Sequence, residues 1–261
     1  MKIVVCIKQV PDTTEVKIDP KTGTLIREGV PSIMNPDDKG GLEFALQLKD
    51  RFGAEVTVIT MGLPQAEAIL REALAMGVDR AILLTDRKLG GADTLATSSA
   101  LAGALRKMEY DLVITGRQAI DGDTAQVGPQ IAEHLGLPQV SYMEDLQYDE
   151  KSKTFTIRKQ MEDGYQILEM QAPCVVTALA SAVHPRYMSV NGIVTAYDKE
   201  VEVWGADRIE VPEERIGKAG SPTSVYKAFP KQLKPAGETF EVTPEEAVEL
   251  IINKLKEKHI I

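Results

Sequence analysis

The sequence predicts an α/β fold with a Rossmann-like parallel sheet flanked by helices. Over the first 140 residues, short apolar runs rich in Val and Ile alternate with helical patterns. This alternation is typical of parallel sheets with right-handed crossovers. Several loops that follow the apolar runs are rich in Gly, Asp and Thr. Ligands of open α/β sheets bind beyond the carboxyl ends of the strands, so these loops form the candidate site.

The predicted elements follow from hydrophobic period and stop signals. Glycines at Gly53 and Gly77 end the first two helical patterns. A small hairpin is expected at residues 16–18 and 24–26. The apolar runs predict strands at residues 3–7, 56–60, 81–85 and 112–115, and the 3.6-residue pattern predicts helices at residues 37–52, 65–76 and 94–107.

After residue 140 the rhythm changes. A hairpin is predicted at residues 154–159 and 165–169, followed by a strand at residues 174–179. Residues 198–241 are charged and rich in Pro and Gly, which is typical either of a disordered tail or of an arm laid along a partner. Their apolar content favours the arm, and the residues concerned are Val201, Val203, Trp204, Ile209, Val211, Tyr226 and Phe229.

We therefore expect an α/β domain at residues 1–197 and a C-terminal arm with a final helix at residues 198–261. The helix is announced by Thr243 as N-cap, Pro244 in its first position and Glu246, which completes a capping box. Its apolar stripe needs a surface to pack on, and this stripe consists of Ala247, Leu250, Ile251 and Leu255.

Composition limits the function. A net charge of −9 and a pI near 5.0 disfavour nonspecific binding to nucleic acid or membranes. No apolar run approaches 18 residues and no signal sequence precedes the first strand, so we expect a cytoplasmic protein without membrane insertion. Cys6 and Cys174 lie in apolar runs and are expected in the core rather than in a disulfide. Three scattered histidines give little support for a histidine metal site.

The loop of residues 116–136 follows one predicted strand and opens a helix. We expect the helix to begin at Asp123 or Thr124. Asp123 would then cap Gln126, a purely structural role. Alternatively, backbone N–H groups from Thr124 to Gly128 are exposed to a pyrophosphate, and the glycines permit close approach. A phosphatase nucleophile loop and a calcium loop fit the segment poorly, because Asp121 lies six residues beyond the strand and Gln126 stands where calcium loops need Gly.

A second loop, at residues 90–98, opens the next helix. Asp93 is expected as its N-cap. Thr94 and Thr97 are three residues apart and share the face of the first turn, so their hydroxyls could meet a flavin edge or a second nucleotide. Residues 32–36 and 61–64 form further loops at strand ends. The sequence contains no Gly-x-Gly-x-x-Gly or Walker motif and no recognisable catalytic triad, so any chemistry would come from a cofactor.

Several motifs together resemble the β subunit of the electron transfer flavoproteins over the whole chain. They are Lys8-Gln-Val-Pro-Asp-Thr, Met34-Asn-Pro, Ala73-Leu-Ala-Met-Gly-Val-Asp, the segment from Gly116 to Gly128, and the pattern from Ile157 through Glu162-Asp-Gly to Val175-Val-Thr. The resemblance implies a heterodimer with an α subunit that carries a redox FAD. It also implies an adenine-nucleotide site in this chain, which holds a structural AMP in ordinary members.

The segments Asp121-Gly-Asp-Thr-Ala-Gln-Val-Gly and Gly91-Ala-Asp-Thr-Leu-Ala-Thr resemble the electron-bifurcating subgroup. There the β subunit holds a second FAD, which takes a hydride from NADH and sends electrons to the α-subunit FAD with an acyl-CoA dehydrogenase, and to ferredoxin or flavodoxin. AMP remains the alternative cofactor. The residues implied at the cofactor are Val10, Asn35, Met61, Thr94, Thr97, Asp121, Gly122, Asp123, Thr124, Ala125, Gln126, Val127 and Gly128.

The family resemblance also implies that the dehydrogenase docks on the loop of residues 184–191. Arg186, Tyr187 and Val190 are the candidate contacts, with Val190 at the position of the apolar anchor. The alternative is an ordinary surface turn in which Arg186 and Tyr187 pack locally. A stand-alone nucleotide-binding sensor of the same fold is a third functional hypothesis, and the arm of residues 198–241 speaks against it.

Overall fold

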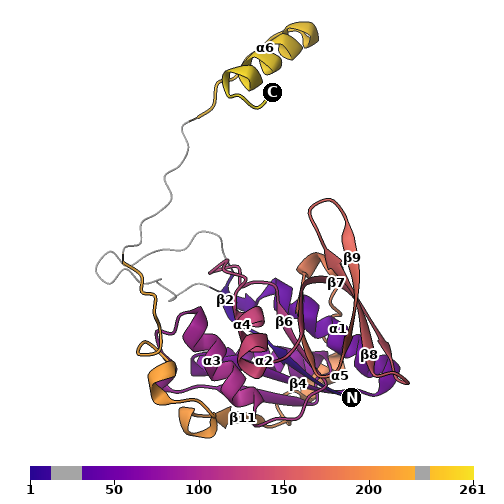
Figure 1. Ribbon diagram of the computed structural model, residues 1–261, viewed down its shortest axis with the longest axis vertical. Helices are drawn as coiled ribbons and strands as arrows, with labels where there is room; N and C mark the ends of the chain where they lie inside the picture. The colour runs from indigo at the N-terminus through magenta and orange to yellow at the C-terminus, as the bar shows by residue number, and fades with distance from the viewer. Residues whose placement is uncertain (13–30, 227–235) are drawn as a thin grey trace. The chain divides into compact units, whose positions relative to one another are not determined.

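The computed structural model describes residues 1–12, 31–226 and 236–261. The chain divides into two compact units, Met1–Ala228 and Phe229–Ile261. The hairpin predicted at residues 16–18 and 24–26 lies outside the described residues. Figure 1 shows the first unit as a twisted sheet with helices on both faces.

A nine-stranded sheet forms the centre of the first unit, in the order β11-β5-β4-β1-β6-β10-β7-β8-β9. Neighbouring strands from β11 to β7 are parallel, whereas β7, β8 and β9 pair antiparallel. The predicted fold class is confirmed. The strands are β1 (Lys2–Cys6), β4 (Glu55–Met61), β5 (Arg80–Leu84), β6 (Leu112–Gly116), β7 (Gln139–Asp149), β8 (Thr154–Gln160), β9 (Tyr165–Gln171), β10 (Cys174–Ala178) and β11 (Val201–Trp204).

Helices cover both faces of this sheet because the buried parallel strands are apolar on both sides. On one face, Ile3 and Val5 belong to the same core as α1 (Pro36–Phe52) and α2 (Glu67–Met76). On the other face, Val4 and Cys6 belong to the core of α3 (Thr94–Leu105) and α4 (Val127–Leu135). Both cysteines are buried and free, as predicted.

Several elements of the first unit were not predicted. The long strand β7 precedes the expected hairpin, which is present as β8 and β9. A short antiparallel ladder joins β2 (Gln9–Pro11) to β3 (Ser32–Met34), where a loop was expected. The segment of residues 184–191 runs into a short helix, α5 (Val190–Thr195).

Part of the expected arm belongs to the first unit. β11 pairs in parallel with β5 at one edge of the sheet, and Trp204, Ile209 and Ile216 are buried in the core with α3 and α4. The boundary expected at residue 198 therefore differs from the structure, where the first unit extends to Ala228. These apolar residues complete the chain's own core, so they are not evidence for a partner. Val225 and Tyr226 are exposed.

The second unit contains α6 (Pro244–Glu257). Thr243 caps it, and the capping box with Glu246 is present in both directions. None of its residues is buried, and Val248, Ile251 and Ile252 are exposed apolar side chains. Within the described part of the chain, no helix is long and apolar enough to cross a membrane.

Candidate functional site

The direction of strand addition reverses at β1. The chain adds β4 and β5 on one side of β1 and then crosses to place β6 on its other side. Ligands of such sheets bind in the crevice at this reversal, beyond the carboxyl ends of the strands. The loops that follow β1 and β6 lie at this reversal. An ion pair joins them, with Lys8 Nζ 2.6 Å from Asp121 Oδ1.

The loop between β6 and α4 is longer than the sequence predicts. The helix begins at Val127, not at Asp123 or Thr124 as predicted. Asp123 and Ala125 have φ angles of 49° and 52°, which lie in the left-handed region and cannot continue a right-handed helix. The Asp123 carboxylate also does not cap Gln126, because it accepts a hydrogen bond from Gln118 Nε2 at 2.8 Å.

The unwound segment leaves a row of donors without partners. Among the described residues, no acceptor is within hydrogen-bonding reach of the backbone N–H groups from Thr124 to Gly128. The first intrahelical bond of α4 runs from Gln130 N–H to Gln126 C=O, and no side chain caps this end. Free N–H groups and the helix dipole together favour an anion at a helix N-terminus.

Two glycines bracket this segment in different ways. A Cβ on Gly122 would meet no atom within 4 Å, whereas a Cβ on Gly128 would lie 2.5 Å from Thr115 Oγ1 and 2.7 Å from Thr177 Cγ2. Gly128 therefore lets the first turn of α4 pack directly on the ends of β6 and β10. Gly122 leaves open space at the exposed side of the loop.

The N-terminus of α3 lies beside this loop. Asp93 caps α3, as predicted, by accepting the Ala96 N–H at 3.0 Å. Thr94 Oγ1 lies 2.9 Å from Gln126 Oε1, so the first turns of α3 and α4 are joined. Thr97 follows in the first turn of α3 and is half-buried. Both predicted hydroxyls are thus at the carboxyl edge of the sheet.

The other predicted residues are placed at the same edge, but their side chains are less available. Val10, in β2, is buried. Asn35 is fully buried, and its amide donates to Gln118 C=O and accepts the Ile120 N–H. Met61 is half-buried at the end of β4. Asn35 therefore holds the loop after β6 in place, with no free polar atom for a ligand.

Sequence reasoning missed two buried carboxylates at the start of α1. Asp37 accepts the N–H groups of Ala180 and Gln118 at 2.8 and 3.3 Å and pairs with Arg117. Asp38 accepts the N–H groups of Lys8 and Gly116. Burial raises the pKa of Asp38 to about 7. Acidic residues in a first turn normally complement the helix dipole, so the sequence alone gave no sign that they bridge loops.

The predicted docking residues divide into two kinds. Arg186 is tied to α1, since its guanidinium binds Glu43 at 2.9 Å and Asp50 at 2.8 Å. Hydrogen bonding to Glu43 raises the pKa of Arg186. Tyr187 and Val190 are 98% and 81% exposed. The local packing considered as an alternative for Arg186 and Tyr187 is therefore present for Arg186 and absent for Tyr187.

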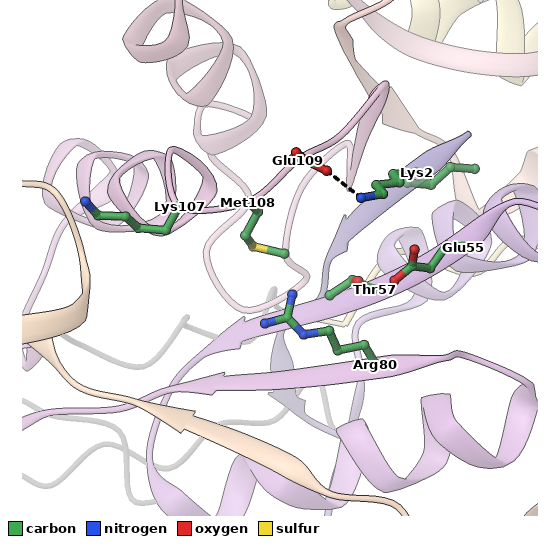
Figure 2. A pocket seen from close by; sticks show the side chains of 8 residues that line it. Lys2, Glu55, Thr57, Arg80, Lys107, Met108 and Glu109 are labelled. Carbon is green, nitrogen blue, oxygen red and sulfur yellow. Dashed lines mark hydrogen bonds and ion pairs between the residues drawn. The ribbon is translucent and has the colours of Figure 1, made fainter.

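A hollow of about 210 Å³ lies at the opposite, amino edge of the sheet. Figure 2 shows three cationic side chains around it, Lys2, Arg80 and Lys107. Each is already paired, with Glu109, Glu202 and Glu210 respectively. Because these charges are neutralised by the protein itself, the amino edge offers a poorer anion site than the free N–H groups at the carboxyl edge.

Comparison with known proteins assigns the family. The model of the electron transfer flavoprotein domain matches residues 22–209. The chain belongs to the electron transfer flavoprotein family. The electron transfer flavoprotein subunit beta of Clostridium acetobutylicum is 58% identical over 261 residues, which is the full length of both chains.

Two further relatives also align along their whole length. The caffeyl-CoA reductase-Etf complex subunit CarD of Acetobacterium woodii is 53% identical over 264 residues, and the acryloyl-CoA reductase electron transfer subunit gamma of Anaerotignum propionicum is 43% identical over 270 residues. Both alignments cover all of each chain. The electron transfer flavoprotein chain described here is thus a β subunit of an electron transfer complex.

Proposed function

We propose that this β subunit binds FAD at the carboxyl edge of its sheet and takes part in electron bifurcation with the α subunit. When bound, FAD would supply hydride acceptance from NADH and electron transfer to the α-subunit FAD and to ferredoxin or flavodoxin. The observation that carries the proposal is the row of N–H groups from Thr124 to Gly128 without partners among the described residues. Such a row is suited to a pyrophosphate.

The residues of this chain would bind and orient the cofactor. The N–H groups of Thr124 to Gly128 would hold the phosphates, with the space beside Gly122 left for the ligand. Asp121 and Asp123 would shape the turn, because their carboxylates already bind Lys8 and Gln118. Thr94 and Thr97 would approach the flavin from the first turn of α3.

The names of the relatives support a partner that acts on acyl-CoA compounds. CarD is named for a caffeyl-CoA reductase complex, and the Anaerotignum relative is named for an acryloyl-CoA reductase. We propose that an acyl-CoA dehydrogenase docks on Tyr187 and Val190, which are exposed in the loop that Arg186 fastens to α1 and at the start of α5. The exposed apolar side chains of α6 would pack on the α subunit.

The cofactor content decides between the FAD and AMP alternatives. The chain is co-expressed with its α subunit, and the acid extract of the heterodimer is separated by chromatography and quantified by absorbance. Two FAD and no AMP per heterodimer would support the proposal. One FAD with one AMP would leave this chain with a structural nucleotide and remove the proposed role of Thr94 and Thr97.

A substitution at Gly122 tests the placement of the phosphates. We expect Gly122→Asp to weaken FAD binding by roughly a hundredfold, because a carboxylate would face the phosphates in the open space of the loop. Gly122→Ala is the matched control, since an added methyl group meets no atom within 4 Å. Equal FAD retention by both variants would refute the placement.

A further inference from the structure

A single buried carboxylate joins the loop after β1 to the end of β6. Asp38 is 6% exposed. Its Oδ2 accepts the backbone N–H of Lys8 at 2.8 Å, and its Oδ1 accepts that of Gly116 at 2.9 Å. Lys8 opens the loop after β1, and Gly116 ends β6. The helix that carries Asp38 does not use it as a cap, so this side chain acts between strands and not within α1.

Gly116 packs closely against Asp38. A Cβ at this position would clash with Asp38 Oδ1 and with the backbone nitrogen of Asp38. The close approach allows the carboxylate to reach the first residue of the segment that ends at Gly128. Lys8, the other partner of Asp38, forms an ion pair with Asp121 in the loop after β6. Asp38 therefore ties the start of this segment to the loop after β1, beside the bonds that Asn35 and Asp37 make to Gln118.

This arrangement requires the ionised form. The two oxygens of Asp38 accept the N–H groups of Lys8 and Gly116, and a proton on either oxygen would weaken the bond accepted there, because a neutral carboxyl is a poorer acceptor than a carboxylate. Burial raises the pKa of Asp38 to about 7, although hydrogen bonds from Asn35, Lys8 and Gly116 oppose this shift. The charge of this group therefore changes within the range of pH in which most proteins work.

The ionisable groups around Asp38 lie on α1, on β1 and in the two loops. Asp37, on the same helix, raises the pKa of Asp38 further. Burial raises the pKa of Cys6, in β1, to about 12, so this thiol stays protonated. In the two loops, Lys8 is paired with Asp121 and Arg117 is paired with Asp37.

We propose that ionised Asp38 is the positioning residue of the nucleotide site, and that nucleotide affinity falls when its carboxyl is protonated. Asp38 does not touch the nucleotide; it sets the spacing between the loop after β1 and the loop after β6. The inference rests on the nucleotide binding proposed above for the segment from Gly116 to Gly128.

The first test measures FAD affinity of the full-length heterodimer, stripped of nucleotide, between pH 5.5 and 8.5. The pyrophosphate of FAD keeps its charge over this range. We expect wild-type affinity to rise about tenfold with pH, with a midpoint near 7. Asp38→Asn, which mimics the protonated form, should bind at the weaker level throughout. Asp79→Asn is the matched control, because Asp79 also accepts a backbone N–H, from Val56 at the amino edge. Equal pH dependence in Asp38→Asn and wild type would overturn the proposal.

A second measurement is independent of the nucleotide. In the nucleotide-free wild-type protein, the amide NMR signals of Lys8 and Gly116 should titrate together near pH 7. They should not titrate together in Asp38→Asn, and the wild-type result stands alone if this variant fails to fold. Absence of the shared titration in the wild type would overturn the positioning role. Shared titration without FAD binding at any pH would instead refute the proposed function.

Discussion

The N-termini of α3 and α4 lie at the same edge of the sheet, yet their first N–H groups are treated differently. The Asp93 carboxylate caps α3 and also accepts hydrogen bonds from the backbone N–H and the hydroxyl of Thr223. The backbone N–H of Asp93 donates to Ser221 Oγ. Among the residues that the structure describes, no side chain caps α4, and Asp123 and Ala125 adopt left-handed φ angles in the segment before it. The Asp93 carboxylate already occupies the N-terminus of α3, so the N-terminus of α4 is better suited to take up an anion.

The most damaging change to the α4 end should be Gly128→Val. The new side chain would overlap Thr115 and Thr177 at the ends of β6 and β10, so α4 would have to move away from the sheet. We expect a loss of about 1–3 kcal/mol in unfolding free energy, as for other overpacked sites, together with loss of bound nucleotide. Urea unfolding and cofactor analysis check this, with Gly122→Ala as the control. Retention of nucleotide would contradict close packing of α4.

The start of α1 differs from both of these helix ends, because it carries the buried carboxyl group of Asp38. Burial disfavours the charged form of this group and raises its pKa. An unfolded aspartate titrates at about 3.8, whereas folded Asp38 titrates at about 7. Between these values the folded chain holds a proton that the unfolded chain has lost, so stability falls as pH rises. Relative to Asp38→Asn, wild type should lose on the order of 1.4 kcal/mol per pH unit in this window. Urea unfolding from pH 4 to 8 measures it, and a constant difference would speak against the burial effect.

Removing the cap of α3 should have a smaller effect. Asp93→Ala leaves the Ala96 N–H without its acceptor and releases Thr223, and N-cap losses cost about 0.5–2 kcal/mol. Asp93→Asn, an equally good cap, should stay near wild type. Thermal unfolding of both variants gives the comparison. If the two variants were equally destabilised, the charge of Asp93 rather than its capping bond would be the stabilising feature.

The smallest effect is expected for the bond between the two helix ends. Thr94→Val keeps the shape of the side chain and removes the hydroxyl that lies 2.9 Å from Gln126 Oε1. Because both groups are partly exposed to water, we expect a change of about 0.5–1.5 kcal/mol or less in unfolding free energy. Thr97→Val serves as a comparison in the same turn. A larger loss of FAD affinity than of stability in Thr94→Val would indicate contact with the cofactor.

The sequence predicted the alternating strands and helices well because each core element carries a clear apolar period. It failed at β7, whose buried residues Val140, Met143 and Leu146 are spaced by three. A strand normally alternates with a period of two, but register shifts and a positive φ of 60° at Tyr142 break this period. β11 was missed because a short edge strand in a charged, Pro-rich segment carries little pattern.

The candidate site was predicted in part. The loops were found because Gly and Asp follow apolar runs, and the Asp93 cap follows from local rules alone. The start of α4 was misplaced, because only the fold imposes left-handed angles on Asp123 and Ala125. The bridging role of Asp38 could not be predicted, since its partners at Lys8 and Gly116 are distant in sequence and meet only when the strands pair.

The buried Asp38 carboxylate also bears on engineering. Replacing a charged group that the fold desolvates with a neutral one of similar shape relieves an energetic penalty. A laboratory selection for heat resistance alone would therefore favour substitutions at Asp38. The selected variants would have weaker bonds between residue 38 and the backbone of Lys8 and Gly116. Screens for a sturdier form of this subunit should score cofactor retention beside melting temperature, because at this residue the two qualities are expected to move in opposite directions.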